Sequence, residues 1–257
     1  PVGGPPPYVG KAALAARIEK LPPMDFAKVV EVFYTVSDTI FLCKTEVKFK
    51  DKPSSFFILD KFVVDGDFKI TSAEAHFHPF QVGAPRPEEA HKAIDAFCDR
   101  FAAGLADPKD DALLKLFAET GSWADPVGGP PPYVGKAALA ARIEKLPPMD
   151  FAKVVEVFYT VSDTIFLCKT EVKFKDKPSS FFILDKFVVD GDFKITSAEA
   201  HFHPFQVGAP RPEEAHKAID AFCDRFAAGL ADPKDDALLK LFAETGSWAD
   251  PVGGPPP

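Results

Sequence analysis

Apolar positions spaced three and four residues apart predict a helix over residues 88–106. The charged residues of this segment fall off the apolar stripe, as expected for a helix with one buried face. Pro87 and two glutamates suit its N-terminus, and Asp107-Pro108 ends it. The stripe consists of Ala90, Ile94, Phe97, Phe101 and Leu105. Shorter apolar patterns predict a second helix over 109–118 and a third over 136–145.

The period changes from helical to alternating after Pro148. Runs rich in Val, Phe and Tyr predict strands over 151–161, 164–174, 180–189 and 193–203. Turn residues separate these runs, and Asp190-Gly191 is a hairpin signal. Three helices followed by hairpin-linked strands predict an α+β domain, in which a curved antiparallel sheet wraps against the helices as a cone. The apolar mouth of such a cone is a natural small-molecule site.

The sequence repeats with a period of 125 residues. No substitution separates residues 1–125 from 126–250, and a third copy begins at Pro251. A period this long has the size of a small domain, so the chain is a tandem array. We expect 85–207 to form one complete domain. Segments 1–82 and 208–257 are then the C-terminal and N-terminal parts of a second copy, which close on each other or on a neighbouring chain. Alternatively, 1–125 and 126–250 fold as two permuted domains.

Composition and charge narrow the class of protein. Apolar residues make up 46% and charged residues 26% of the chain, as in soluble globular proteins. A net charge of −8 argues against nucleic acid or an anionic membrane as partner. The four cysteines lack metal-type spacing and lie in apolar segments, which predicts buried free thiols in a reducing, cytoplasmic compartment. The 26 phenylalanines predict an aromatic core or pocket, and we expect no cofactor.

Asp125 is the first candidate for chemistry. It lies between Trp123 and a run rich in Pro and Gly, and Pro126 favours an extended backbone at Asp125. Prolines also remove backbone donors that would compete for the carboxylate. An aspartate on a stiff, apolar loop could act as a catalytic base. The alternative is an ordinary turn aspartate before proline. Asp250 is the equivalent residue of the next repeat.

Asp185, with its copy Asp60, is the second candidate. Strand alternation places Asp185 on one face with Ile183 and Phe187. If that face is the inner one, burial raises the pKa of the carboxyl, and the neutral acid could donate a hydrogen bond to a ligand oxygen. If the other face is buried, Asp185 pairs with a surface lysine instead.

A third group, Glu199, His201 and His203, shares one strand face as a metal site would require. The alternating alanines and Phe202 are the apolar set of this strand. The polar set is therefore expected to face outward or into a subunit contact, and we expect no metal.

The Asp125-Pro-Val-Gly loop resembles the base-bearing loop of ketosteroid isomerases, which belong to the NTF2-like or SnoaL-like fold. The run Leu184-Asp-Lys-Phe-Val-Val-Asp-Gly191 resembles the family's strand with its second catalytic aspartate. The resemblance implies that Asp125 is the general base and Asp185 the protonated donor to a dienolate oxygen. Phe101 and Ile143 stand where this family has tyrosines. Loss of one oxyanion donor typically costs on the order of 10²–10³ in rate.

The resemblance implies proton transfer on a hydrophobic carbonyl compound such as a 3-oxosteroid. The alternative is a non-catalytic repeat protein that binds hydrophobic ligands or self-associates through its sheet face or exchanged halves. Residues expected to line the pocket are Trp123, Phe101, Tyr133, Ile143, Phe187 and Phe202, with Trp248, Phe226, Tyr8, Phe62 and Phe77 from the other copy.

Overall fold

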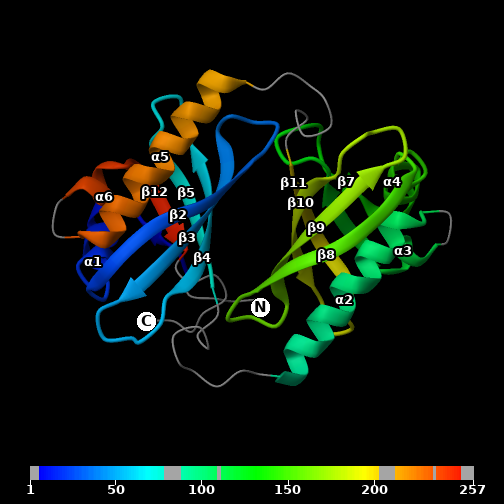
Figure 1. Cartoon of the computed structure of the whole chain (residues 1–257), viewed down its shortest axis with the longest axis horizontal. Coiled ribbons are helices and arrows are strands. Elements are labelled where there is room, and N and C mark those ends of the chain that lie inside the picture. Colours follow the sequence, from blue (N-terminus) through cyan, green and yellow to red (C-terminus); the bar gives the residue numbers. More distant parts are fainter. Residues whose placement is uncertain (1–5, 78–87, 109–110, 203–211, 234–235, 250–257) are drawn as a thin grey trace. The chain divides into compact units, whose positions relative to one another are not determined.

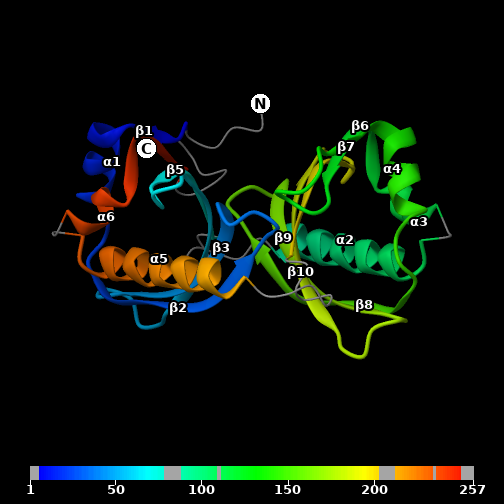
Figure 2. The same cartoon turned by 90° about the horizontal axis from the view of Figure 1, so that it is seen from above.

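A computed structural model describes residues 6–77, 88–108, 111–202, 212–233 and 236–249. The chain divides into two compact units, drawn in Figures 1 and 2. Unit 1 combines Pro1–Pro85 with Pro212–Pro257, and unit 2 is Arg86–Arg211. No helix among the described residues has the length and apolarity needed to cross a membrane.

Unit 2 contains three helices and a six-stranded sheet with strand order β7-β6-β11-β10-β9-β8. Its longest helix packs along β8 (Figure 1). Its elements are α2 (Glu88–Ala106), α3 (Ala112–Lys115), β6 (Phe117–Ala124), β7 (Tyr133–Val134), α4 (Gly135–Ile143), β8 (Met149–Tyr159), β9 (Ile165–Phe174), β10 (Phe181–Val189) and β11 (Ile195–His201).

Unit 1 repeats this arrangement with the strand order β1-β12-β5-β4-β3-β2. Its sheet joins distant parts of the chain, because β12 pairs with both β1 and β5. Its elements are β1 (Tyr8–Val9), α1 (Lys11–Ile18), β2 (Met24–Tyr34), β3 (Ile40–Phe49), β4 (Phe56–Val64), β5 (Ile70–His76), α5 (Glu213–Ala231), α6 (Ala237–Lys240) and β12 (Phe242–Ala249).

The predicted α+β class, the helix over 88–106 and the four hairpin-linked strands are confirmed. The helix predicted over 109–118 is wrong beyond one turn, because the chain from Phe117 onward is strand β6. The predicted antiparallel sheet holds for β8 to β11 but is wrong where β6 joins it, since β6 runs parallel to β11. Gly121 permits this pairing where its register shifts. A Cβ atom there would lie 2.5 Å from the Ile195 carbonyl oxygen.

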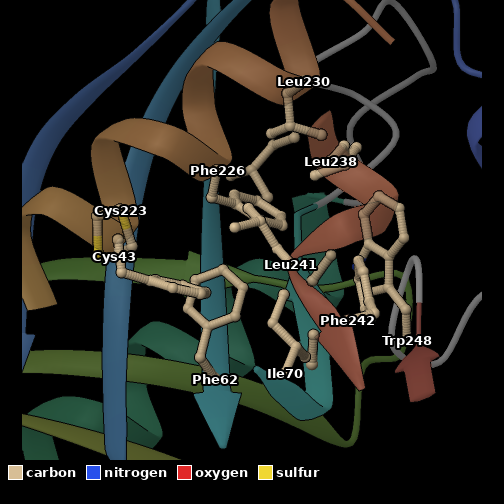
Figure 3. Packing of buried hydrophobic residues seen from close by; sticks show 14 of the residues in the cluster. Cys43, Phe62, Ile70, Cys223, Phe226, Leu230, Leu238, Leu241, Phe242 and Trp248 are labelled. Atoms are coloured by element: carbon tan, nitrogen blue, oxygen red, sulfur yellow. The ribbon is translucent and has the colours of Figure 1, made fainter. Parts of the chain in front are cut away.

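Phenylalanine rings fill the space between the long helix and the sheet in each unit. In unit 2 the ring of Phe187 lies 4.7 Å from Phe101 and 5.2 Å from Phe97, both on α2, in edge-to-face geometry. Figure 3 shows the same packing in unit 1, where Phe226 lies between Phe62 and Trp248. The predicted aromatic core is confirmed, and it fixes the helix against the face of the sheet that carries the candidate acids.

The β10–β11 turn occurs where Asp190-Gly191 predicts it, but a different residue takes the left-handed backbone. Phe193 has a φ of 55°, and Gly191 is not among the residues with positive φ. The Asp190 carboxylate stabilises this turn by accepting the backbone N–H groups of Asp192 at 3.0 Å and Lys194 at 2.9 Å. The aspartate, rather than the glycine, therefore determines the shape of the turn.

Candidate functional site

Asp125 follows the last residue of β6 and begins a loop that is fixed to the sheet. The backbone N–H of Val127 donates to the carbonyl oxygen of Ala200 on β11 at 2.9 Å. The N–H of Gly129 donates to the carbonyl of Pro126 at 3.1 Å and closes a tight turn. The first contact attaches the loop after Asp125 to β11, and the second tightens the loop itself.

A buried ion pair forms between Asp125 and Arg142 on α4. The Arg142 Nη2 atom lies 2.7 Å from Asp125 Oδ2, and the two side chains are 18% and 5% exposed. Burial raises the pKa of the Asp125 carboxyl, and the positive charge and hydrogen bond of Arg142 partly oppose this rise. The carboxylate thus has one strong partner and little contact with water.

Two aromatic rings enclose the Arg142 guanidinium. Its Cζ atom lies 5.9 Å from the Trp123 ring centre and 6.0 Å from that of Tyr133, which is paired with Trp123 across the two strands. Sequence reasoning missed Arg142. An arginine in the last turn of a short helix is typical of a favourable interaction with the helix dipole, so the pattern gave no sign of a buried role.

Asp185 lies in the middle of β10 and is 1% exposed. It is paired with Cys168 on β9 and Ala200 on β11. The strand face that carries Asp185 is therefore turned toward the core. Burial raises the pKa of its carboxyl well above the usual value, and the nearby Cys168 and Asp125 raise it further. Asp185 Oδ2 has no hydrogen-bond partner among the described residues.

The sheet brings the two acids together through Ala200. Its backbone pairs with Asp185 on one side, and its carbonyl accepts the N–H of Val127 two residues beyond Asp125. Asp125 has a cationic partner, whereas Asp185 has none among the described residues. The site therefore holds one carboxyl that favours its charged form more than the other does.

A cavity of about 190 Å³ in unit 1 shows what these residues enclose. Asp60, Arg17 and Trp248 line it, and their equivalents in unit 2 are Asp185, Arg142 and Trp123. Apolar side chains form most of the remaining wall, including Leu21, Met24, Phe49, Phe56, Ile58 and Phe77. The cavity is smaller than the roughly 300–1,000 Å³ of sites for drug-sized ligands.

The indole N–H of Trp123 is a second buried group that has no partner among the described residues. Trp123 is 2% exposed, and its Nε1 atom finds no acceptor among the described residues. The same holds for Trp248 in the described part of unit 1. Sequence reasoning treated these residues only as pocket walls. A buried donor of this kind usually has a partner in the functional state, such as a ligand or an ordered water.

The other pocket residues named from the sequence lie in several places. Phe101 and Phe187, like Phe226 and Phe62, belong to the aromatic cores behind the candidate site. Tyr8 faces Arg17 as Tyr133 faces Arg142. Phe202 packs on Phe181 beside the core, as its equivalent Phe77 packs on Phe56 at the cavity. Asp250 lies outside the described residues.

Ile143 lines a different and larger hollow of about 950 Å³. This groove lies between the end of α2 and helices α3 and α4, and Asp107, Asp111 and Glu144 are among its lining residues. Neither candidate acid lines it. Its size alone does not make it the site, because none of its described lining residues carries an unpartnered buried polar group.

In the part of the chain that the structure describes, no group of three or more His, Cys, Asp or Glu side chains could hold a metal ion. His201 is buried, and its Nε2 atom lies 3.3 Å from Glu199 Oε2. His203 lies outside the described residues. The expectation that the polar residues of this strand all face outward is therefore wrong for His201.

No family model and no curated protein sequence matches the chain. The epoxide hydrolase/cyclase-like enzyme SalBIII, which acts in pyran ring formation in the polyether salinomycin, is 13% identical with a TM-score of 0.39. The match covers 46% of this chain and 94% of SalBIII. A protein from Sphaerobacter thermophilus is 28% identical with a TM-score of 0.36, and the match covers 43% of this chain and 96% of that protein.

A computationally designed binder of 17-OHP is 13% identical with a TM-score of 0.39, and the match covers 43% of this chain and 91% of the binder. These TM-scores are below 0.5, so the likenesses assign neither a fold family nor a function to this chain. Function is therefore inferred from the site itself.

Proposed function

We propose that each unit is an isomerase that moves a proton along a small, hydrophobic carbonyl compound, within an NTF2-like fold of the ketosteroid isomerase type. Asp125 removes a proton from the carbon between the carbonyl and a carbon–carbon double bond. The same carboxyl returns the proton to the far end of the resulting dienolate. The double bond thereby moves into conjugation, and no atom is gained or lost.

The observation that carries this proposal is the buried carboxyl of Asp185, whose Oδ2 atom has no hydrogen-bond partner among the described residues. A neutral acid in this position can donate a hydrogen bond to the dienolate oxygen, and its low-dielectric surroundings strengthen that bond. The indole N–H of Trp123 is our candidate for the second donor. It would supply a hydrogen bond that the side chains of Phe101 and Ile143 cannot.

The cavity volume guides the choice of substrate. A space of about 190 Å³ fits a single ring better than a four-ring steroid. Cyclohex-3-enone is therefore the substrate to test first, with a 5-ene-3-oxosteroid as the larger comparison. The conjugated product absorbs in the ultraviolet, so turnover can be followed directly.

The decisive variant replaces the base in both repeats, Asp125→Asn with Asp250→Asn. We expect turnover to fall by about 10²–10⁴, the range typical of general-base removal. The matched control replaces two exposed turn residues, Asp192→Asn with Asp67→Asn, and should keep the original rate. Turnover that survives loss of the base, or that is absent from the unaltered protein with both ketones, would contradict the proposal.

Non-catalytic binding of a hydrophobic ligand is the second candidate, and the Asp125–Arg142 ion pair favours it. An arginine at 2.7 Å makes the carboxylate a weaker base than burial alone would. In this case the cyclohexenones would bind and change Trp123 fluorescence, with no conversion of one into the other. Self-association of the repeats would then be the remaining role to test.

A further inference from the structure

Arg142 has more hydrogen-bonding capacity than Asp125 uses. Its guanidinium carries five N–H donors. Among the described residues, its ion pair is the contact of Nη2 with Asp125 Oδ2. The rings of Trp123 and Tyr133 lie 5.9 and 6.0 Å from its Cζ atom and carry no carboxylate to take the remaining donors. Such a fork is suited to a second carboxylate.

In unit 1, the arginine equivalent to Arg142 places its guanidinium at the cavity that we propose holds the ligand. Arg17 lines the cavity together with Asp60 and Trp248. It is the one cationic side chain among the residues that line this cavity in the described part of the chain. Asp60 also lines this cavity, and burial raises the pKa of the equivalent carboxyl in unit 2, that of Asp185, which favours its neutral form. The cation therefore lies in the wall of a mostly apolar cavity.

We propose that the natural ligand of this site is a small hydrophobic monocarboxylic acid, such as an unsaturated or oxo acid, whose carboxylate binds Arg142 in unit 2 and Arg17 in unit 1. This inference rests on the proposed function for the place of the reacting carbons. It adds the ligand's charge, which a ketosteroid-type site does not require. The apolar walls hold the hydrocarbon chain, and Asp185 and Trp123 face its polar end.

The ligand carboxylate would also act on the base. It takes donors on the guanidinium, so the hold of Arg142 on Asp125 weakens. Its negative charge next to Asp125 further favours the protonated form of that carboxyl, which makes Asp125 a stronger base toward carbon. An anionic substrate would thus activate the base in a way that a neutral ketone of the same size cannot.

Fluorescence titration can test the inference in one unit. The chain has two tryptophans, so Trp248→Phe leaves Trp123 as the single reporter, next to Arg142. The probes are hex-3-enoate and hex-3-enamide, which differ in charge at nearly equal size. We expect the carboxylate to bind about tenfold more tightly, the effect of one charge-assisted hydrogen bond.

Variants of the ion pair give opposite results. Asp125→Asn should increase the affinity for hex-3-enoate severalfold, because it removes a competitor for Arg142, and should leave that for hex-3-enamide unchanged. Arg142→Gln should abolish the preference for the carboxylate. Because this change strips a buried carboxylate of its counter-ion, the neutral double variant Asp125→Asn/Arg142→Gln is tested in parallel. The exposed Arg100→Gln on α2 is the matched control and should keep the preference.

Equal binding of the two probes, or a preference that survives in both Arg142 variants, would overturn the inference. These results are independent of the enone assay. Enone turnover that requires Asp125, without a carboxylate preference, refutes this inference alone. A carboxylate preference that increases in Asp125→Asn, without enone turnover, supports the inference and refutes the isomerisation of neutral enones.

Discussion

Replacing Asp185 by asparagine should remove much of the pH dependence of unit 2 stability. Burial raises the pKa of this carboxyl well above its usual value in the folded protein. Below the usual value, about 3.9, both the folded and the unfolded chain are protonated at this position. Above it, the unfolded chain releases the proton and the folded chain retains it. The free energy of unfolding therefore falls as pH rises, until the folded carboxyl ionises.

The size of this pH dependence follows from the titration of a single proton at the Asp185 carboxyl. A difference of one bound proton lowers the free energy of unfolding by about 1.4 kcal/mol for each pH unit in that window. The amide of Asp185→Asn does not titrate, so its slope should be shallower by about this amount. Asp125 also has a raised pKa. Its contribution to the slope has the same direction in both proteins, so it largely cancels when the two slopes are compared.

Urea unfolding can measure this difference between about pH 5 and pH 8. Both proteins carry Trp248→Phe, so that Trp123 reports on unit 2 alone. Asp192→Asn, which removes an exposed carboxyl, should leave the slope unchanged. If the Asp185→Asn variant and its parent have parallel slopes, this carboxyl ionises in the fold much as it does in the unfolded chain. It could not then be the neutral hydrogen-bond donor on which the proposed function depends.

Two further predictions concern the helix packing and the closure of unit 1. Gly104→Ala should destabilise unit 2 by about 1–3 kcal/mol despite the better helix propensity of alanine, because the new Cβ would lie 2.9 Å from Leu113 Cβ and 3.0 Å from its Cα. Thermal unfolding tests this, with Gly191→Ala as control, since nothing lies within 4 Å there. Oxidation with diamide should join Cys43 and Cys223, which face each other from β3 and α5 in Figure 3. With the unit 2 cysteines replaced by alanine, the product on a non-reducing gel should be a cross-linked single chain. A ladder of covalent dimers and larger species would instead show that neighbouring chains exchange these segments.

The sequence predicts the long helices and hairpins because each has a single buried face. Helix α2 shows the 3.6-residue period over its full length, and its predicted ends agree with the structure. Strand β6 was missed for a physical reason. Leu113 to Phe117 is a short apolar run that suits a helix or a strand equally well. Its parallel pairing with β11 decides between them, and that contact joins residues about 75 positions apart, beyond any local pattern.

The orientation of Asp185 illustrates the same limit at the site. Alternation assigns Asp185, Ile183 and Phe187 to one face, but both faces of β10 are largely covered, since Leu184 and Lys186 are buried as well. The sequence pattern therefore could not decide which face meets the core. Pairing with Cys168 decides it, because Cys168 belongs to the aromatic core cluster beneath α2.

The roles of the two acids differ because their surroundings differ, and Arg142 contributes to that difference. Both carboxyls are buried, so desolvation alone would make both neutral and leave the site without a base. Arg142 contacts Asp125 at 2.7 Å and opposes the effect of burial there, whereas Asp185 has no cation among the described residues. The arginine thus favours the charged form of Asp125, while burial favours the neutral form of Asp185. This difference favours Asp125 as base and Asp185 as donor, and it is also why an anionic ligand at Arg142 would change the strength of the base.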